Sequence, residues 1–97
     1  MLKVYVAETI GSFIFFSIFF TKNDPIFIAV GLLIGILIAS IASQAHLNPA
    51  VSTMAYINGD MSGEIAIGYV GAQLVGAFLA LQWTNLMGKK TDLNQII

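Results

Sequence analysis

The stretch QAHLNPAVST, residues 44–53, decides how this chain of 97 residues folds. It brings a histidine, an asparagine and a proline together between apolar segments on both sides. Asn48 is a good N-cap residue, and Pro49 suits the first turn of a helix, where its missing N–H costs nothing. We therefore expect a helix to begin at Pro49 in the middle of a hydrophobic chain.

The composition predicts an integral membrane protein. The chain is 58% hydrophobic and 9% charged, whereas soluble proteins are roughly half apolar and a quarter charged. The net charge of −1 and the lack of a basic patch give no reason to expect a nucleic-acid partner. With no cysteine and one histidine, the sequence predicts neither a disulfide nor a metal site, and no cofactor is expected.

Three apolar segments are long enough to cross a bilayer, at about 4–20, 25–42 and 64–87, because a core of about 30 Å takes roughly 20 helical residues. The first segment carries Glu8 and does not end in the small residues of a signal-peptide cleavage site, so we interpret it as a retained span. The segments belong to a single domain, residues 1–97.

The remaining segment, residues 43–57, is too short to span. A helix over residues 49–57 is about 14 Å long at 1.5 Å per residue, which is half of the bilayer core. A half-length helix that is entered from a polar loop is a re-entrant segment. It cannot face lipid, because its unpaired backbone groups would have no partner there.

Small residues recur at every fourth position in the spans. This spacing lets helix backbones approach closely in lipid, where packing drives association. We expect close helix packing at these positions: Gly11, Gly31, Gly35, Gly68, Ala72 and Gly76.

The lysines give only a weak preference for one orientation in the membrane. Three spans place the termini on opposite sides, with Lys3 on one side and Lys22, Lys89 and Lys90 on the other. This bias weakly favours a cytoplasmic C-terminus and is small enough for both orientations to be inserted.

Three stretches resemble one family in the same order along the chain. HLNPAVS (46–52) resembles the first asparagine-proline-alanine loop of the aquaporin and glycerol-facilitator family, AETIGSF (7–13) its first helix, and GYVGAQLVGAFLAL (68–81) its third. The resemblance implies an all-α membrane protein with three transmembrane helices and one re-entrant half-helix.

Family members carry two such units in one chain, inverted relative to each other, and this chain carries one. A midplane site made by opposed discontinuous helices requires both units. The resemblance therefore implies an antiparallel homodimer, with the pore at the interface of two inverted copies. Four such pores could cluster further.

The resemblance also assigns the centre of the pore. Asn48, Pro49 and Ala50 would lie there, with the Asn48 amide donating to water or hydroxyl groups, a role compatible with its N-cap role. The positive ends of two half-helices would repel cations.

The expected constriction lacks the usual cation. The family keeps an arginine three residues after the second loop's asparagine, but Val51 stands at the corresponding distance from Asn48, and the chain has no arginine. The second-helix filter position aligns with Ile28 or Val30, and Ala45 comes from the loop. These residues predict an uncharged constriction that suits water, glycerol-like solutes or dissolved gases.

Three polar residues are expected to support the loop. Glu8 is expensive inside an apolar span unless it is paired, and the resemblance has it accept hydrogen bonds from loop backbone near His46 and Asn48. A proton relay is the alternative role of Glu8. His46 would bond within the loop, and Gln73 would bond to a helix or the loop rather than to a substrate.

The sequence thus predicts a passive channel for water or small neutral solutes in the cell membrane. The alternative is a non-conducting half-channel subunit that pairs with another membrane protein. An enzyme is not expected, because the sequence offers no nucleophile–base pair, metal cluster or phosphate loop.

Overall fold

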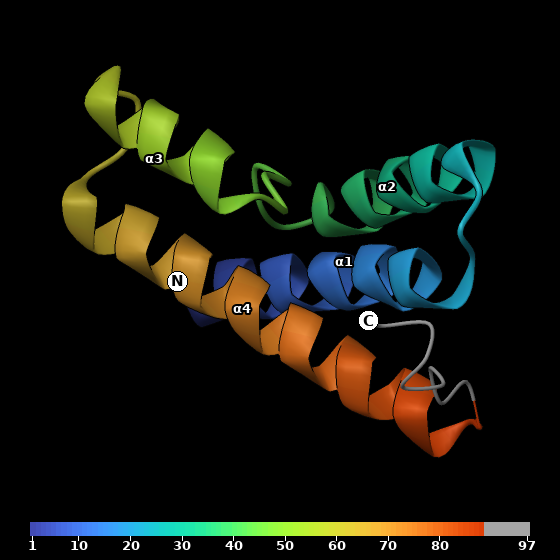
Figure 1. Ribbon diagram of the computed structural model, residues 1–97. Helices are drawn as coiled ribbons and strands as arrows, with labels where there is room; N and C mark the ends of the chain where they lie inside the picture. Colours follow the sequence, from blue (N-terminus) through green and yellow to red (C-terminus); the bar gives the residue numbers. More distant parts are fainter. Residues whose placement is uncertain (89–97) are drawn as a thin grey trace.

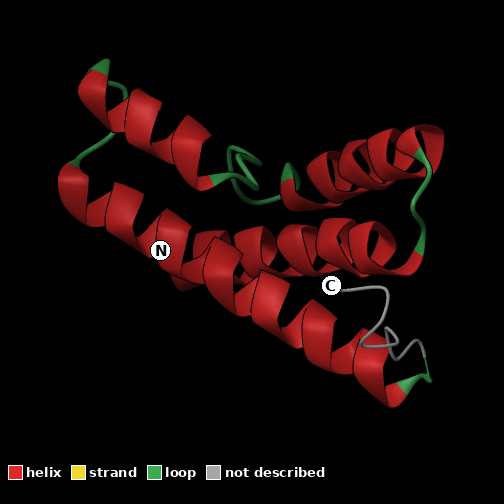
Figure 2. Ribbon diagram, viewed as in Figure 1, coloured by secondary structure: helices red, strands yellow, loops and turns green. Residues whose placement is uncertain are grey.

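The computed structural model describes residues 1–88, and that part of the chain is built from helices and loops (Figures 1 and 2). Lys89 and Lys90, which entered the orientation argument, lie outside the described residues. The helices are α1 (Leu2–Thr21), α2 (Pro25–Ala39), α3 (Pro49–Ile57) and α4 (Gly63–Leu86).

Two of the described helices, α1 and α4, have the length and apolar composition of a complete span. The 15 residues of α2 reach about 22 Å, less than a core of about 30 Å. The expected second span, 25–42, therefore contains a helix that ends at Ala39. The hydroxyls of Ser40 and Ser43 bond to the carbonyls of Leu37 and Ala39, a local alternative to further helix.

Helix α1 lies at the centre of the fold. It contacts α2 on one side and α4 on the other, while α3 contacts α4. Figure 1 shows that α2 and α3 lie roughly in line above α1 and α4, and that the loop of residues 40–48 joins them. This loop therefore lies midway along the bundle rather than at one end.

Small residues let the helices meet backbone to backbone. A Cβ added at Gly11 would lie 2.7 Å from Ala39 Cβ and 2.8 Å from the Gly35 carbonyl oxygen, and one added at Gly76 would lie 2.5 Å from Thr9 O. Such a close approach leaves room for hydrogen only. The other small residues also lie at helix contacts: Gly31 beside Ile18, Gly68 beside Tyr5, and the buried Ala72.

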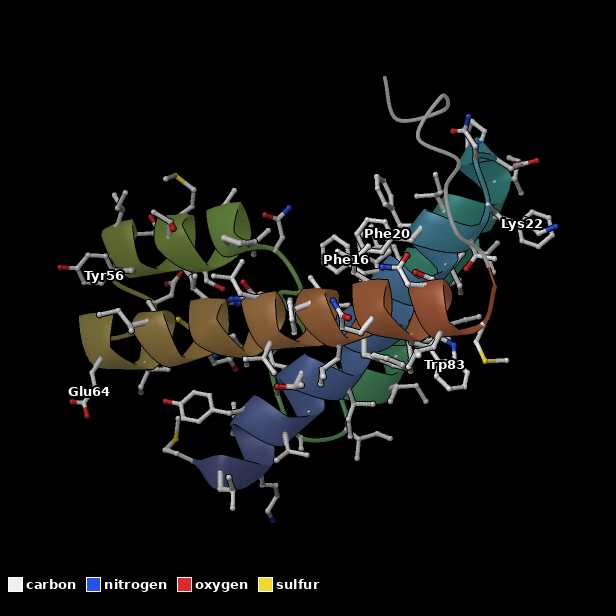
Figure 3. The ribbon with its side chains drawn as sticks, turned by 60° about the horizontal axis from the view of Figure 1, so that its bottom comes forward. Phe16, Phe20, Lys22, Tyr56, Glu64 and Trp83 are labelled. Atoms are coloured by element: carbon white, nitrogen blue, oxygen red, sulfur yellow. The ribbon has the colours of Figure 1, made fainter. Side chains whose placement is uncertain are left out.

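Polar residues gather at the helix ends. Asp24 accepts hydrogen bonds from Ile26 N and Phe27 N and so caps α2. Figure 3 places Lys22 at one end of the bundle and Glu64 at the other. The bundle between these ends is mainly apolar on its outside, as a membrane-spanning protein requires.

Candidate functional site

The site begins at the N-terminus of α3. Asn48 has an extended backbone, with φ −153°, and its side-chain oxygen accepts from Ala50 N at 2.8 Å. Pro49 is the first helical residue. Asn48, Pro49 and Ala50 are all exposed, and the Asn48 Nδ2 group donates to no described residue. This amide is therefore available to a molecule that reaches the start of α3.

The loop before α3 has an unusual backbone. Ala45 and Leu47 both have φ 52°, a left-handed conformation that non-glycine residues adopt at a cost. Buried side chains hold the loop in this shape: Leu47 N donates to Glu8 Oε2 at 2.6 Å, and Gln44 N donates to the Tyr69 hydroxyl at 3.0 Å. The loop's conformation is therefore set by α1 and α4.

With these N–H groups turned inward, the loop's carbonyl groups are left without partners. Within the described chain, no donor bonds to the backbone oxygens of residues 43–47. Every backbone carbonyl is a strong acceptor that requires a partner. These oxygens can therefore bond to water or to hydroxyl groups.

Glu8 is the anchor of the loop, and it is fully buried. Its Oε1 accepts from Ser43 Oγ at 2.8 Å, and its Oε2 accepts from Leu47 N at 2.6 Å and from Gln73 Nε2 at 2.9 Å. All three donors are neutral. A buried acid that accepts from loop and helix has a structural reason to lie inside a span.

A second chain of bonds ties α3 to α4 and to the loop. Gln73 Nε2 also bonds to Ser52 Oγ at 2.9 Å, and Ser52 Oγ lies 2.9 Å from His46 Nδ1. His46 Nε2 lies 3.2 Å from Gln44 Oε1, which can only accept. With the amides in these orientations, His46 carries its proton on Nε2 and accepts from Ser52 at Nδ1.

Sequence reasoning missed three members of this network, namely Ser43, Ser52 and Tyr69. Ser52 is fully buried, and the Tyr69 ring lies 4.8 Å from the His46 ring. A signal for Ser52 existed: it is a hydroxyl four residues after Asn48 in a short, mainly apolar helix. The partners of these residues lie far away in sequence and gave no comparable signal.

A groove of about 650 Å³ runs along α3 beside the loop. Val51, Met54 and Ala55 form its apolar wall, while Gln44 and His46 belong to the loop on the other side. Its outer end is polar, where Asn58 Nδ2 donates to Asp60 Oδ2 at 3.0 Å. The groove thus has one apolar and one polar wall.

The structure of one chain separates the expected constriction residues. Val51 lines the groove and is 45% exposed. Ile28 and Val30 lie in the first turns of α2 and are not lining residues of the groove, and neither is Ala45, which lies in the loop. Of the four expected constriction residues, Val51 is the one that lines this groove in the described chain.

The chain matches the family model of the major intrinsic proteins over residues 1–96. It belongs to this family. The resemblance seen in the sequence is thereby confirmed, and the chain is an integral membrane protein of a family of channels rather than enzymes.

This major intrinsic protein can be compared in length with one curated relative. The chain is 34% identical over 90 residues to glycerol uptake facilitator protein-like 6 of Lactiplantibacillus plantarum, and the match covers 81% of this chain. The chain spans 41% of the length of that relative. No solved structure matches the chain.

Proposed function

We propose that this chain is one half of a passive channel in the cell membrane for water and small neutral solutes of the glycerol type. The groove beside α3 carries the proposal, because its loop wall offers polar groups of Gln44 and His46 while its α3 wall is apolar, and the Asn48 amide is exposed at the start of the same helix. Water and polyols lose hydrogen bonds to bulk water when they enter a narrow pore, and polar groups in the pore wall replace those bonds. The name of the curated relative supports the same solute class.

A second, inverted copy of the chain supplies the other half of the pore in this proposal. Helix α3 has nine residues and is about 14 Å long, so two copies placed end to end extend about 27 Å, close to a bilayer core of about 30 Å. Inverted repeats that meet in this way build midplane sites in transporters. Asn48, Pro49 and Ala50 of the two copies then meet at the centre.

The constriction of this pore is uncharged. Val51 of both copies lies beside the centre, and Ala45, Ile28 and Val30 complete the walls, with the α2 residues facing the half-channel of the other copy. The chain has no arginine to place there. Rejection of cations then rests on the positive N-terminal ends of the two half-helices.

The buried polar residues support the pore rather than the passage of protons. Glu8 and Gln73 bond to each other and to the loop or α3, and His46 bonds to Ser52 and Gln44. Gln73 and a backbone N–H occupy two of the positions around Glu8, and neither readily passes a proton on. We assign the three side chains a positioning role.

Flux through liposomes tests the proposal. The full chain, reconstituted in liposomes, should speed both osmotic shrinkage and glycerol entry, measured by stopped-flow light scattering. Asn48→Asp should abolish both, because it replaces the central donor with a negative charge, and Val51→Trp should block the pore. Ile10→Trp is the matched control, because Ile10 is 45% exposed on α1, does not line the groove and is not one of the proposed pore residues.

The outcome also decides between the channel and its alternative. Lipid-limited shrinkage with well-folded protein contradicts a channel made by this chain alone and favours a half-channel subunit that pairs with another membrane protein. Tags on both termini should each be found on both sides of the cell membrane. A single orientation excludes the antiparallel homodimer.

The number of chains per particle tests the higher assembly. The mass of the protein in mild detergent distinguishes a two-chain pore from a cluster of four such pores. Clustering needs no contact within the pore itself, so it is independent of the flux measurements.

A further inference from the structure

The rotation of α3 about its axis is fixed by one residue. Ser52 is fully buried and bonds to Gln73 of α4 and to His46 of the loop. Successive residues of a helix are about 100° apart. With Ser52 turned toward α4, Val51, Met54 and Ala55 share the face that lines the groove, and Thr53 points away from it.

Met54 is the most flexible of the α3 side chains that line the groove, which also include the branched Ile57 near its outer end. Met54 is 56% exposed, and its neighbours on the groove-lining face are the smaller Val51 and Ala55. The wall opposite contains Gln44 and His46, both held by hydrogen bonds. The wall is fixed and the methionine is unbranched and adaptable, so Met54 is the side chain whose position controls the width of the groove.

We propose that Met54 sets the largest solute that each half-channel admits. This inference rests on the proposed function. In a pair of inverted copies the channel contains Met54 twice, once on each side of the centre. Met54 lies six residues beyond Asn48, about 9 Å along the helix axis, so the two methionines are about 18 Å or more apart. The channel then has two identical size filters in series, and a solute meets the same filter from either side.

Polyols of increasing length test the size limit. Met54→Ala should raise the permeability of erythritol relative to glycerol by roughly tenfold, the discrimination that one methylene supplies in a tight apolar site. Met54→Leu should leave the ratio near that of the unaltered chain, because leucine has a similar volume. Thr53→Ala is the matched control, since Thr53 is the neighbouring residue on the other side of α3.

Chemical modification tests the duplication. The chain has no cysteine, so Met54→Cys introduces a single thiol. A bulky, membrane-impermeant methanethiosulfonate reagent forms a disulfide with the thiolate and releases a sulfinate. Added only outside the liposomes, it should remove most of the glycerol flux, because every pore presents one copy of Cys at its outer side. A thiol reductant should restore the flux.

These outcomes separate the inference from the proposed function. A Met54→Ala protein that conducts glycerol with the ratio of the unaltered chain overturns the role of Met54 and leaves the channel standing. External reagent that leaves the Met54→Cys flux unchanged, while the same reagent added on both sides blocks it, overturns the duplicated filter. Failure of the unaltered chain to conduct overturns the proposed function, and the inference with it.

Discussion

The two halves of α4 differ in how much of their surface is covered. Near its N-terminal half, Ser52 of α3 bonds to Gln73, and the Tyr56 ring lies 3.2 Å from the position of a Cβ on Gly63. Helix α3 thus covers this half on one side while α1 covers another. The first half of α4 is therefore covered by two helices and has more buried residues than the second half.

The C-terminal half of α4 is covered by α1 alone. Only the small residues that face α1 are buried there, namely Gly76, Ala80 and Thr84. Val75 and Phe78 are 52% and 62% exposed. Because α3 is much shorter than α4, it leaves this half uncovered. In the proposed pore, the α3 of an inverted copy lies against it.

The largest effect on stability is expected at Glu8, which bonds to the loop and to Gln73 in the covered half of α4. Glu8→Leu leaves Leu47 N and one hydrogen of Gln73 Nε2 without an acceptor, whereas the Ser43 hydroxyl can turn to Ala39 O. Because each unsatisfied buried donor costs roughly 1–3 kcal/mol, the free energy of unfolding should fall by about 3–5 kcal/mol. Titration with a denaturing detergent measures it. Glu64→Leu is the control, because Glu64 is exposed. Equal losses of unfolding free energy in the two variants would show that Glu8 does not anchor the loop.

The glycines of α4 give the next comparison. A Cβ at Gly76 would meet Thr9 O and Ser12 Cβ, whereas one at Gly71 would meet nothing within 4 Å. Gly76→Ala should therefore lower the free energy of unfolding by about 1–3 kcal/mol, as overpacking does. Gly71→Ala should keep or slightly raise it, because alanine favours helix. The same titration checks both variants. A greater loss of unfolding free energy in Gly71→Ala than in Gly76→Ala would contradict the close packing of α4 against α1 at Gly76.

Ser52→Ala should act on the position of α3. It removes the acceptor of one Gln73 hydrogen and the partner of His46 Nδ1, so the free energy of unfolding should fall by about 1–2 kcal/mol. Glycerol flux should fall as well, because α3 loses the bond that fixes its rotation. Thr53→Ala should change neither quantity appreciably, and similar effects of the two variants would contradict a fixed rotation.

The smallest effect is expected at Tyr69. Tyr69→Phe keeps the ring beside His46 and removes only the hydroxyl that accepts from Gln44 N. A loss of about 1 kcal/mol in the free energy of unfolding is expected. An unchanged value would mean that water replaces the hydroxyl and that the loop does not depend on α4 at this point.

Local chemistry made part of this structure predictable. Asn48 followed by Pro49 predicts a helix start, and α3 does begin at Pro49. The membrane character follows from composition and is shown by the family. The end of α2 was harder to predict, because Ile41 and Ala42 continue the apolar pattern past Ala39, whereas their N–H groups bond to carbonyls three residues back in tight turns.

Long-range contacts could not be predicted from local patterns. Glu8 and Gln73 are 65 residues apart in sequence and bond to each other. An acid in an apolar span indicates that hydrogen-bond donors must lie nearby. The structure identifies Ser43 and Leu47 as two of these donors. Ile28 and Val30 do not line the groove of the single chain, and no local pattern in the sequence indicated this.

Cross-linking of single cysteines tests the central claim, that two inverted copies meet at the start of α3. In liposomes, Ala50→Cys should link two chains with a short bis-maleimide, because Ala50 lies beside the proposed two-fold axis. Leu86→Cys, at the exposed far end of α4, should not link, since inversion places its two copies on opposite membrane faces. Linkage through position 86 without linkage through position 50 would contradict the claim.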